Sequence, residues 1–227
     1  MTRLHIFAEG QTEKRFVEEL LVNHLFVFEV YVQVSTFTTK FDKQKGKKHK
    51  GGIGNYEKVR REINNLLREN TRECFRVTTM IDLYGIPTDF PGHREAFLKK
   101  DAYEKVDALE NALAADIECS RFIPYVQLHE FEALLFSDPN KLKHLYFDND
   151  RQIGDLVALS EKVNPELIND GPQTSPSKRI MAAISSYDKC FAGSSVAGAI
   201  GLNKIRNKCK HFDEWLCKLE NLNKDVL

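Results

Sequence analysis

Short apolar segments alternate with amphipathic ones along residues 1–136, and this alternation is the strongest constraint on the fold. The predicted strands cover residues 4–8, 27–37, 75–81 and 121–128, and the predicted helices cover 13–25, 56–70, 101–115 and 130–136. Thr12 is expected to cap the first of these helices. Strands that alternate with helices pair in parallel through right-handed crossovers. We therefore expect an α/β fold with a mostly parallel four-stranded sheet flanked by helices.

The pattern changes after Ser137, where only short helical segments follow. These helices are expected near residues 141–145, 155–162, 177–187, 194–200 and 203–222. The sequence therefore predicts two parts: an α/β core over residues 1–137 and an all-helical C-terminal subdomain over residues 138–227.

Overall charge gives no indication of a nucleic-acid partner. The chain has 227 residues, and its 33 basic and 33 acidic side chains give a formal net charge of zero. Binding to nucleic acid would need a local basic patch. No stretch reaches the about 20 apolar residues of a membrane span, and the N-terminus lacks the apolar run of a signal peptide. We expect a cytoplasmic protein that does not contact a membrane.

The five cysteines are widely spaced and form no Cys-x-x-Cys pair. This usage is typical of reduced thiols in the cytoplasm. Cys209, His211 and Cys217 are close enough in sequence to hold zinc, but no fourth ligand is evident. Cysteines on an apolar helix face more often belong to the core, and we favour that interpretation.

Acidic residues stand at the ends of three predicted strands. Glu9 follows the first strand, Asp82 the third, and Glu130 the fourth. The carboxyl ends of parallel strands form the ligand-binding edge of an open sheet. Carboxylates gathered there repel one another, and a hard cation such as Mg²⁺, or Mn²⁺ in its place, relieves that repulsion. The alternative is that each acid is a helix cap or a surface charge.

Glu130 is followed two residues later by a second acid, Glu132. On an α-helix two residues so spaced point about 200° apart, so both could not face one ion without a bent backbone. We therefore choose Glu130, together with Glu9 and Asp82, as the expected metal ligands.

Basic residues that could contact phosphates occur in three places. Lys47, Lys48 and Lys50 lie in a lysine- and glycine-rich segment, Lys178 and Arg179 open a predicted helix, and Arg206 lies in a further basic cluster. Lysines on a loop add non-specific affinity for nucleic acid, and a helix N-terminus attracts anions. Ordinary solvated charge explains each of them about as well.

Several motifs resemble a known family. Residues 7–13, Phe-Ala-Glu-Gly-Gln-Thr-Glu, are similar to the Glu-Gly-x-Thr-Glu opening of Toprim-like domains. More narrowly, the chain resembles a bacterial domain-of-unknown-function family of the DUF4276 type, which is placed among Toprim-like proteins. That resemblance rests on residues 9–13, 82–85, 127–136, 176–179 and 200–215.

The resemblance implies catalytic roles for Glu9, as general acid/base, and for Glu13. It also implies an Asp-x-Asp pair that binds metal, but here Asp82 is followed by Leu83 and Tyr84. Asp89 or Glu130 would have to complete the metal site. Relatives often stand beside an ATPase gene, and some such pairs defend bacteria against phage.

The leading hypothesis is therefore a magnesium-dependent nuclease, or a related phosphodiester-processing hydrolase, of the Toprim class. Its expected partners are nucleic acid, with DNA favoured, and an ATPase protein. The alternatives are a non-catalytic Toprim-fold binding module, which the missing second Asp favours, and a small-nucleotide enzyme or sensor. The sequence contains no Gly-x-x-x-x-Gly-Lys-Ser/Thr loop, which excludes ATP hydrolysis by that route.

Overall fold

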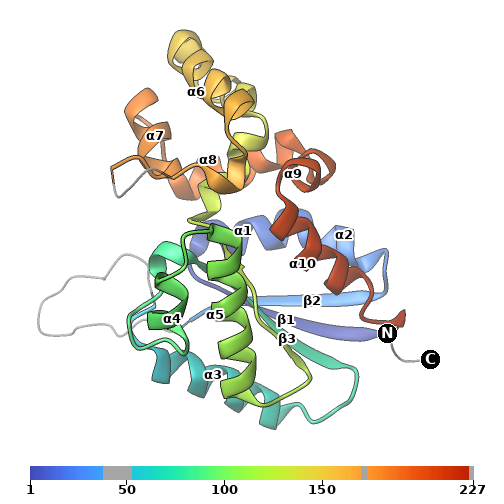
Figure 1. Ribbon diagram of the computed structural model, residues 1–227. Helices are drawn as coiled ribbons and strands as arrows, with labels where there is room; N and C mark the ends of the chain where they lie inside the picture. The colour runs from blue at the N-terminus through green and yellow to red at the C-terminus, as the bar shows by residue number, and fades with distance from the viewer. Residues whose placement is uncertain (38–52, 170–172, 225–227) are drawn as a thin grey trace, which may run out of the picture.

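The computed structural model describes residues 1–37, 53–169 and 173–224. Its centre is a parallel sheet in the order β2-β1-β3-β4, with β5 also paired to β3 (Figure 1). The strands are β1 (Thr2–Ala8), β2 (Val30–Thr36), β3 (Phe75–Asp82), β4 (Phe122–Ile123) and β5 (Val126–Gln127). The predicted α/β class and parallel pairing are confirmed.

The fourth predicted strand is not continuous. It is divided into β4 and β5 at Pro124, which has no N–H to donate to the sheet. Thr79 of β3 bridges the break, because its hydroxyl donates to the Tyr125 carbonyl at 2.9 Å and accepts from the Tyr125 N–H at 3.0 Å. A side chain thus replaces the missing ladder bonds.

The first helical segment begins earlier than predicted. It consists of α1 (Gln11–Phe16), a π-helical stretch η1 (Val17–Leu21) and α2 (Val22–Phe26). Thr12 is not its cap: Gly10 occupies that position, and the Glu13 carboxylate accepts a 2.8 Å hydrogen bond from the Gly10 N–H. Glu13 thus satisfies the backbone from inside the first turn, while Thr12 is buried.

The two faces of the sheet are covered by different helices. On one face, α3 (Tyr56–Glu69), α4 (His93–Phe97) and α5 (Ala102–Ile117) enclose a core that includes Val77 and Ile81 of β3. On the other face, α1, α2 and α10 (Lys210–Glu220) enclose Leu4, Ile6 and Met80. Figure 1 shows α1, α2 and α10 on one side of the strands and α3 on the other.

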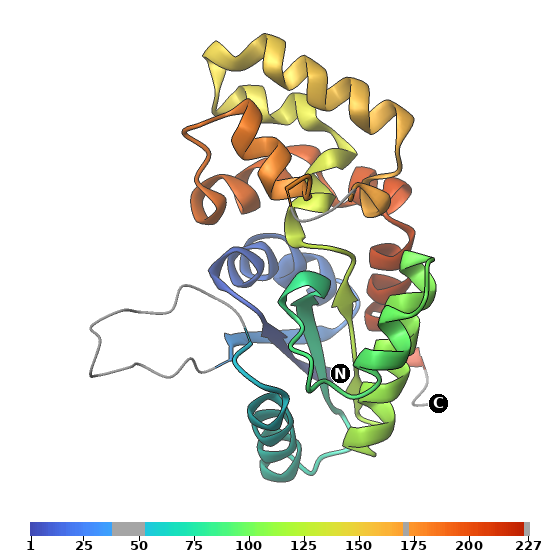
Figure 2. The same cartoon turned by 60° about the vertical axis from the view of Figure 1, so that its left-hand side comes forward.

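The C-terminal part is helical, as predicted, but much of it is in short 3₁₀ turns. These are η3 (Phe131–Ser137), η4 (Pro139–His144), η5 (Phe147–Asn149) and η6 (Pro165–Leu167). The α-helices are α6 (Asp150–Lys162), α7 (Pro176–Ala183), α8 (Lys189–Ile200), α9 (Leu202–Lys208) and α10. Figures 1 and 2 both place α6, α7 and α8 together, away from α3.

Two predicted helices in this region were wrong in kind or extent. Residues 130–136 were expected to be α-helical, but Glu130 is extended and η3 starts at Phe131. The helix predicted over residues 203–222 is two helices that meet at Cys209. The division after residue 137 stays a prediction. One hydrophobic core contains Leu4 and Ile6 from before this point and Phe212 and Trp215 from after it. None of the helices in the described ranges is long and apolar enough to cross a membrane.

Trp215 anchors α10 on the sheet, which leads to a stability prediction. Its side chain is 2% exposed, stacks on Tyr125 at 4.2 Å and donates a 2.9 Å hydrogen bond to the Thr78 hydroxyl. Trp215→Ala should therefore lower the free energy of unfolding by about 3–5 kcal/mol, measured by urea denaturation. Phe147→Ala is the control, because Phe147 is 76% exposed; its effect should stay within about 0.5 kcal/mol. Equal losses of unfolding free energy in the two variants would contradict the role of Trp215 as the anchor of α10.

Candidate functional site

The register of β1 and β3 places Glu9 beside Asp82. Ala8 lies opposite Met80, and the next residue, Glu9, donates its N–H to the Met80 carbonyl at 2.9 Å. The Glu9 carboxylate in turn accepts a 2.9 Å hydrogen bond from the Asp82 N–H. Both side chains are half-buried. Two of the residues singled out from the sequence are therefore joined at the carboxyl edge of the sheet.

The turn after β3 wraps closely around Glu9. This turn is the 3₁₀ helix η2 (Leu83–Gly85). A Cβ added at Gly85 would lie 2.4 Å from both Glu9 carboxylate oxygens, which is closer than any non-bonded contact allows. The absence of a side chain at residue 85 therefore leaves the space that the Glu9 carboxylate occupies.

Glu130 and Glu132 approach the same site from the segment after β5. Both are buried, and both carboxylates lie 3.4 Å from the ammonium of Lys189, the first residue of α8. Glu130 also accepts hydrogen bonds from the N–H of Ser177 at 2.5 Å and from its hydroxyl at 2.9 Å. The expectation that Glu130 and Glu132 point apart was wrong, because the backbone there is extended and then 3₁₀ rather than α-helical.

Five carboxyl groups thus interact with one another and with Lys189; we call them the acidic cluster. They are Glu9, Glu13, Asp82, Glu130 and Glu132. Burial raises the pKa of Glu9 to about 7, and the negative charges of Glu13 and Glu130 act in the same direction. Burial raises the pKa of Glu132 to about 7. The positive charge of Lys189 acts against this shift, and the negative charge of Glu130 adds to it.

Asp82 is the most strongly perturbed member of the acidic cluster. Burial, followed by the charges of Glu13, Glu9, Glu132 and Glu130, raises the pKa of Asp82 well above its ordinary value. Its Oδ1 atom is buried and has no hydrogen-bond partner among the described residues. Burial lowers the pKa of Lys189, but the charges of Glu132, Glu130 and Asp82 outweigh this and raise it overall. The cluster therefore sets five carboxyl groups against one ammonium group, and a bound cation would reduce the repulsion between the ionised carboxylates.

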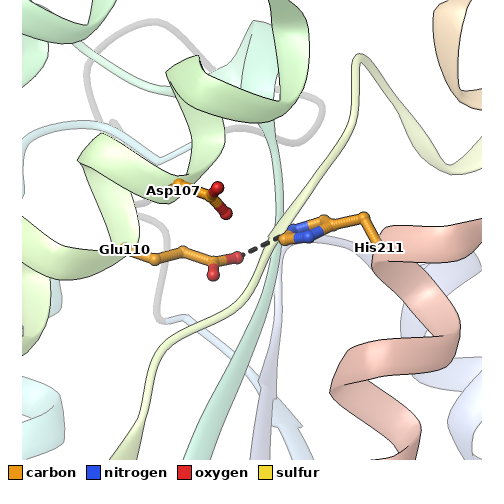
Figure 3. A group of neighbouring side chains, drawn as sticks. All are labelled: Asp107, Glu110 and His211. Carbon is orange, nitrogen blue, oxygen red and sulfur yellow. Dashed lines mark hydrogen bonds and ion pairs between the residues drawn. The ribbon is translucent and has the colours of Figure 1, made fainter.

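A second group that could hold a metal ion lies between α5 and α10. Asp107, Glu110 and His211 offer ligand atoms that all lie within 4.8 Å of one another. Figure 3 shows the two carboxylates and the imidazole directed toward a common region. Among the described residues, this is the one group of three or more such side chains whose ligand atoms all lie that close together. No three ligand atoms of the acidic cluster do so.

The other predicted site residues are dispersed. Lys47, Lys48 and Lys50 lie outside the described residues. Lys178 is exposed on α7, while Arg179 donates to the Thr174 carbonyl at 2.6 Å. Arg206 is engaged by Asp213 and Glu220, each at 2.5 Å.

Neither Asp89 nor the cysteines contribute to a metal site in the described residues. The Asp89 carboxylate accepts from the Tyr56 N–H at 3.0 Å, at the start of α3. Cys209 is buried against the Ser137 hydroxyl, and Cys217 contacts Arg206. His211, considered with them as a zinc ligand, instead faces Glu110.

Sequence reasoning set Glu132 aside and missed Lys189, Asp107 and Glu110. Lys189 carries no local signal, because only the packing of α8 on the core brings it to the strand ends. Asp107 and Glu110 do carry one: they stand three residues apart on one helix, on the same face.

Most of the chain matches one protein family. The model of one family, described as a domain of unknown function (DUF4276), matches residues 8–220. Neither a curated protein nor a solved structure matches the chain. The DUF4276 resemblance is thus confirmed, while the relation to Toprim domains stays a prediction.

The raised pKa values predict that the acidic cluster destabilises the metal-free protein at neutral pH. Because the pKa of Glu132 is about 7 when folded and 4.5 ordinarily, the folded state binds more protons in that interval. Stability is therefore greatest at low pH for this group and is lost as pH rises through about 7. Glu132→Gln, which cannot titrate, should make the melting temperature fall less between pH 5 and 8.

The exposed Glu19 offers the matched control for this measurement. Glu19→Gln should retain the wild-type pH profile in the same thermal melts with chelator present. A profile for Glu132→Gln that coincides with that of Glu19→Gln would show that the buried carboxyl group does not control the pH dependence.

Proposed function

We propose that this chain, which belongs to the DUF4276 family, is a metal-dependent enzyme that cleaves phosphodiester bonds, with the acidic cluster as its active site. The observation that carries the proposal is the buried Oδ1 of Asp82, which lacks a partner in the described residues and faces four other carboxyl groups. Such an environment favours a cation over a further hydrogen-bond donor.

The donor set fits magnesium, or manganese in its place. All the acidic cluster's ligand atoms are carboxylate oxygens, which are the ligands that these hard ions prefer. Glu9, Asp82 and Glu130 would hold the ion, as proposed from their positions at the strand ends. Glu13 and Glu132 add carboxylates that compensate for Tyr84, which stands where a second aspartate would complete an Asp-x-Asp pair.

The chain's own groups supply proton transfer and charge. Without a cation the pKa of Glu9 is about 7, so Glu9 can take up or release a proton near neutral pH. A bound cation would lower this pKa, and Glu9 would then serve as a general base in its ionised form. The Lys189 side chain is 42% exposed, so its ammonium can approach a bound phosphate from the solvent side. When bound, a divalent cation screens the charge of the phosphodiester oxygens and lowers the pKa of water.

Nucleic acid is the proposed substrate, with DNA favoured over RNA. Lys178 is exposed on α7, the helix whose Ser177 hydrogen-bonds Glu130, so it lies on the element next to the acidic cluster. Lys47, Lys48 and Lys50 would add non-specific affinity through phosphate contacts. An ATPase partner and a role in phage defence follow from the Toprim resemblance and are proposed on that basis.

A non-catalytic binding module is the second candidate. Tyr84 favours it, because this residue stands where a second aspartate would complete an Asp-x-Asp pair. Such a module would bind magnesium or manganese and nucleic acid without cleaving the nucleic acid.

Replacement of Glu9 should distinguish the enzyme from the non-catalytic binding module. Glu9→Gln removes the proton-transferring group and should lower the rate of cleavage about 10²–10⁴-fold. Asp82→Asn removes a proposed metal ligand and should abolish metal-dependent cleavage. The substrates are supercoiled plasmid, linear DNA and RNA, each with magnesium or manganese, and circular dichroism should confirm that the variants are folded.

Asp148→Asn, at an exposed acid on η5, is the control and should cleave like the wild type. Metal binding without cleavage by the wild-type protein would replace the enzyme with the binding module. Full activity in Glu9→Gln would remove Glu9 from the mechanism.

The close approach at Gly85 gives an independent prediction. Gly85→Ala should push the Glu9 carboxylate away and weaken manganese binding about 10- to 100-fold, as measured by calorimetry. Gly54→Ala is the matched control, because a Cβ there meets nothing within 4 Å. Unchanged affinity in Gly85→Ala would show that the position of Glu9 is not needed to hold the ion.

A further inference from the structure

We propose that Asp107, Glu110 and His211 form a second metal site, which binds a divalent transition-metal ion such as zinc. Asp107 and Glu110 stand three residues apart on α5, so their side chains share one face of the helix. His211 is the second residue of α10. Figure 3 shows the three side chains converging from these two helices. The inference does not depend on the proposed function.

The burial of the three ligands suits an ion that is held but can be exchanged. Glu110 is 8% exposed and His211 is 5% exposed, whereas Asp107 lies at the surface. Two ligands thus lie in a protected position, and the third opens to solvent. Three protein ligands would leave a further coordination position for water, as in zinc sites with an open position.

Neighbouring groups fix both buried ligands. The Glu110 Oε1 atom accepts a 2.8 Å hydrogen bond from the Val126 N–H, and Tyr125 stacks on the His211 ring at 5.1 Å. The His211 Nε2 atom also lies 3.2 Å from the Val126 carbonyl. Ligands held in this way lose little conformational freedom when an ion binds, and such outer contacts orient metal ligands in known sites.

The donor set selects a transition metal rather than magnesium. An imidazole nitrogen together with carboxylate oxygens suits zinc and its neighbours in the periodic table, whereas magnesium and calcium favour oxygen alone. His211 Nε2 lies 2.9 Å from Glu110 Oε1, so a proton joins these two atoms in the metal-free protein. A zinc ion would replace that proton and use the same two atoms.

An ion at this site would connect two distant parts of the chain. Helix α5 covers one face of the sheet, while α10 packs on the other through Phe212 and Trp215. His211 reaches Glu110 beside Val126 of β5. Zinc would therefore stabilise the docking of α10, which makes thermal stability a readout that is separate from catalysis.

The test is a titration of the metal-free, full-length protein with zinc, in the presence of excess magnesium to occupy the acidic cluster. Calorimetry should give one zinc ion per chain at this site, and zinc should raise the melting temperature. Asp107→Asn should weaken zinc binding at least about tenfold and reduce the rise in melting temperature. Because Asp107 is exposed, this variant should remain folded without metal. Asp107→His, which restores a metal ligand at this position, should recover zinc binding.

Two further variants locate the ion. Zinc binding should be unchanged in Asp148→Asn, at an exposed acid elsewhere, and in Asp82→Asn, which alters the acidic cluster. No zinc binding by the wild type, or equal affinity in Asp107→Asn, would overturn the proposal. Loss of zinc binding in Asp82→Asn but not in Asp107→Asn would assign the ion to the acidic cluster and also overturn it.

Discussion

The parallel pairing of β1 with β3 is the constraint on which the acidic cluster depends. Their register leaves Glu9 and Asp82 side by side where the strands end, and the backbone N–H of Asp82 binds the Glu9 carboxylate. The sheet therefore imposes two like charges on one edge. The surrounding elements are arranged around that fixed pair: Gly85 leaves room for Glu9, and α8 brings Lys189 to the same edge.

The segment after β5 brings further charge toward this edge at some cost to the backbone. His129 has a φ of 61°, a left-handed conformation that a residue with a side chain rarely adopts. This turn precedes the extended Glu130 and the 3₁₀ helix η3, and it allows Glu130 and Glu132 to meet the same ammonium group. Backbone strain of this kind occurs preferentially at functional sites, where surrounding contacts maintain it.

The local pattern of the sequence was sufficient to predict the acidic residues at the carboxyl edge of the sheet, but not the contacts between residues far apart in the chain. Glu9 and Asp82 were recognised because each follows a strand whose apolar residues identify it. Glu132 was rejected because residues 130–136 follow an α-helical pattern, while packing in the structure imposes a 3₁₀ conformation. Lys189 could not be predicted, since it lies 57 residues from Glu132 and meets it only through the packing of α8.

The distribution of the acidic cluster along the chain has a consequence for synthesis. Glu130 precedes Ser177 and Lys189, the two residues that bind its carboxylate, and Glu9 and Asp82 precede Lys189, whose charge acts on both. A growing polypeptide therefore contains the acids well before it contains their partners. The contacts of Glu130 with Ser177 and Lys189 can form only after α7 and α8 have been synthesised, so the cluster is completed late in synthesis.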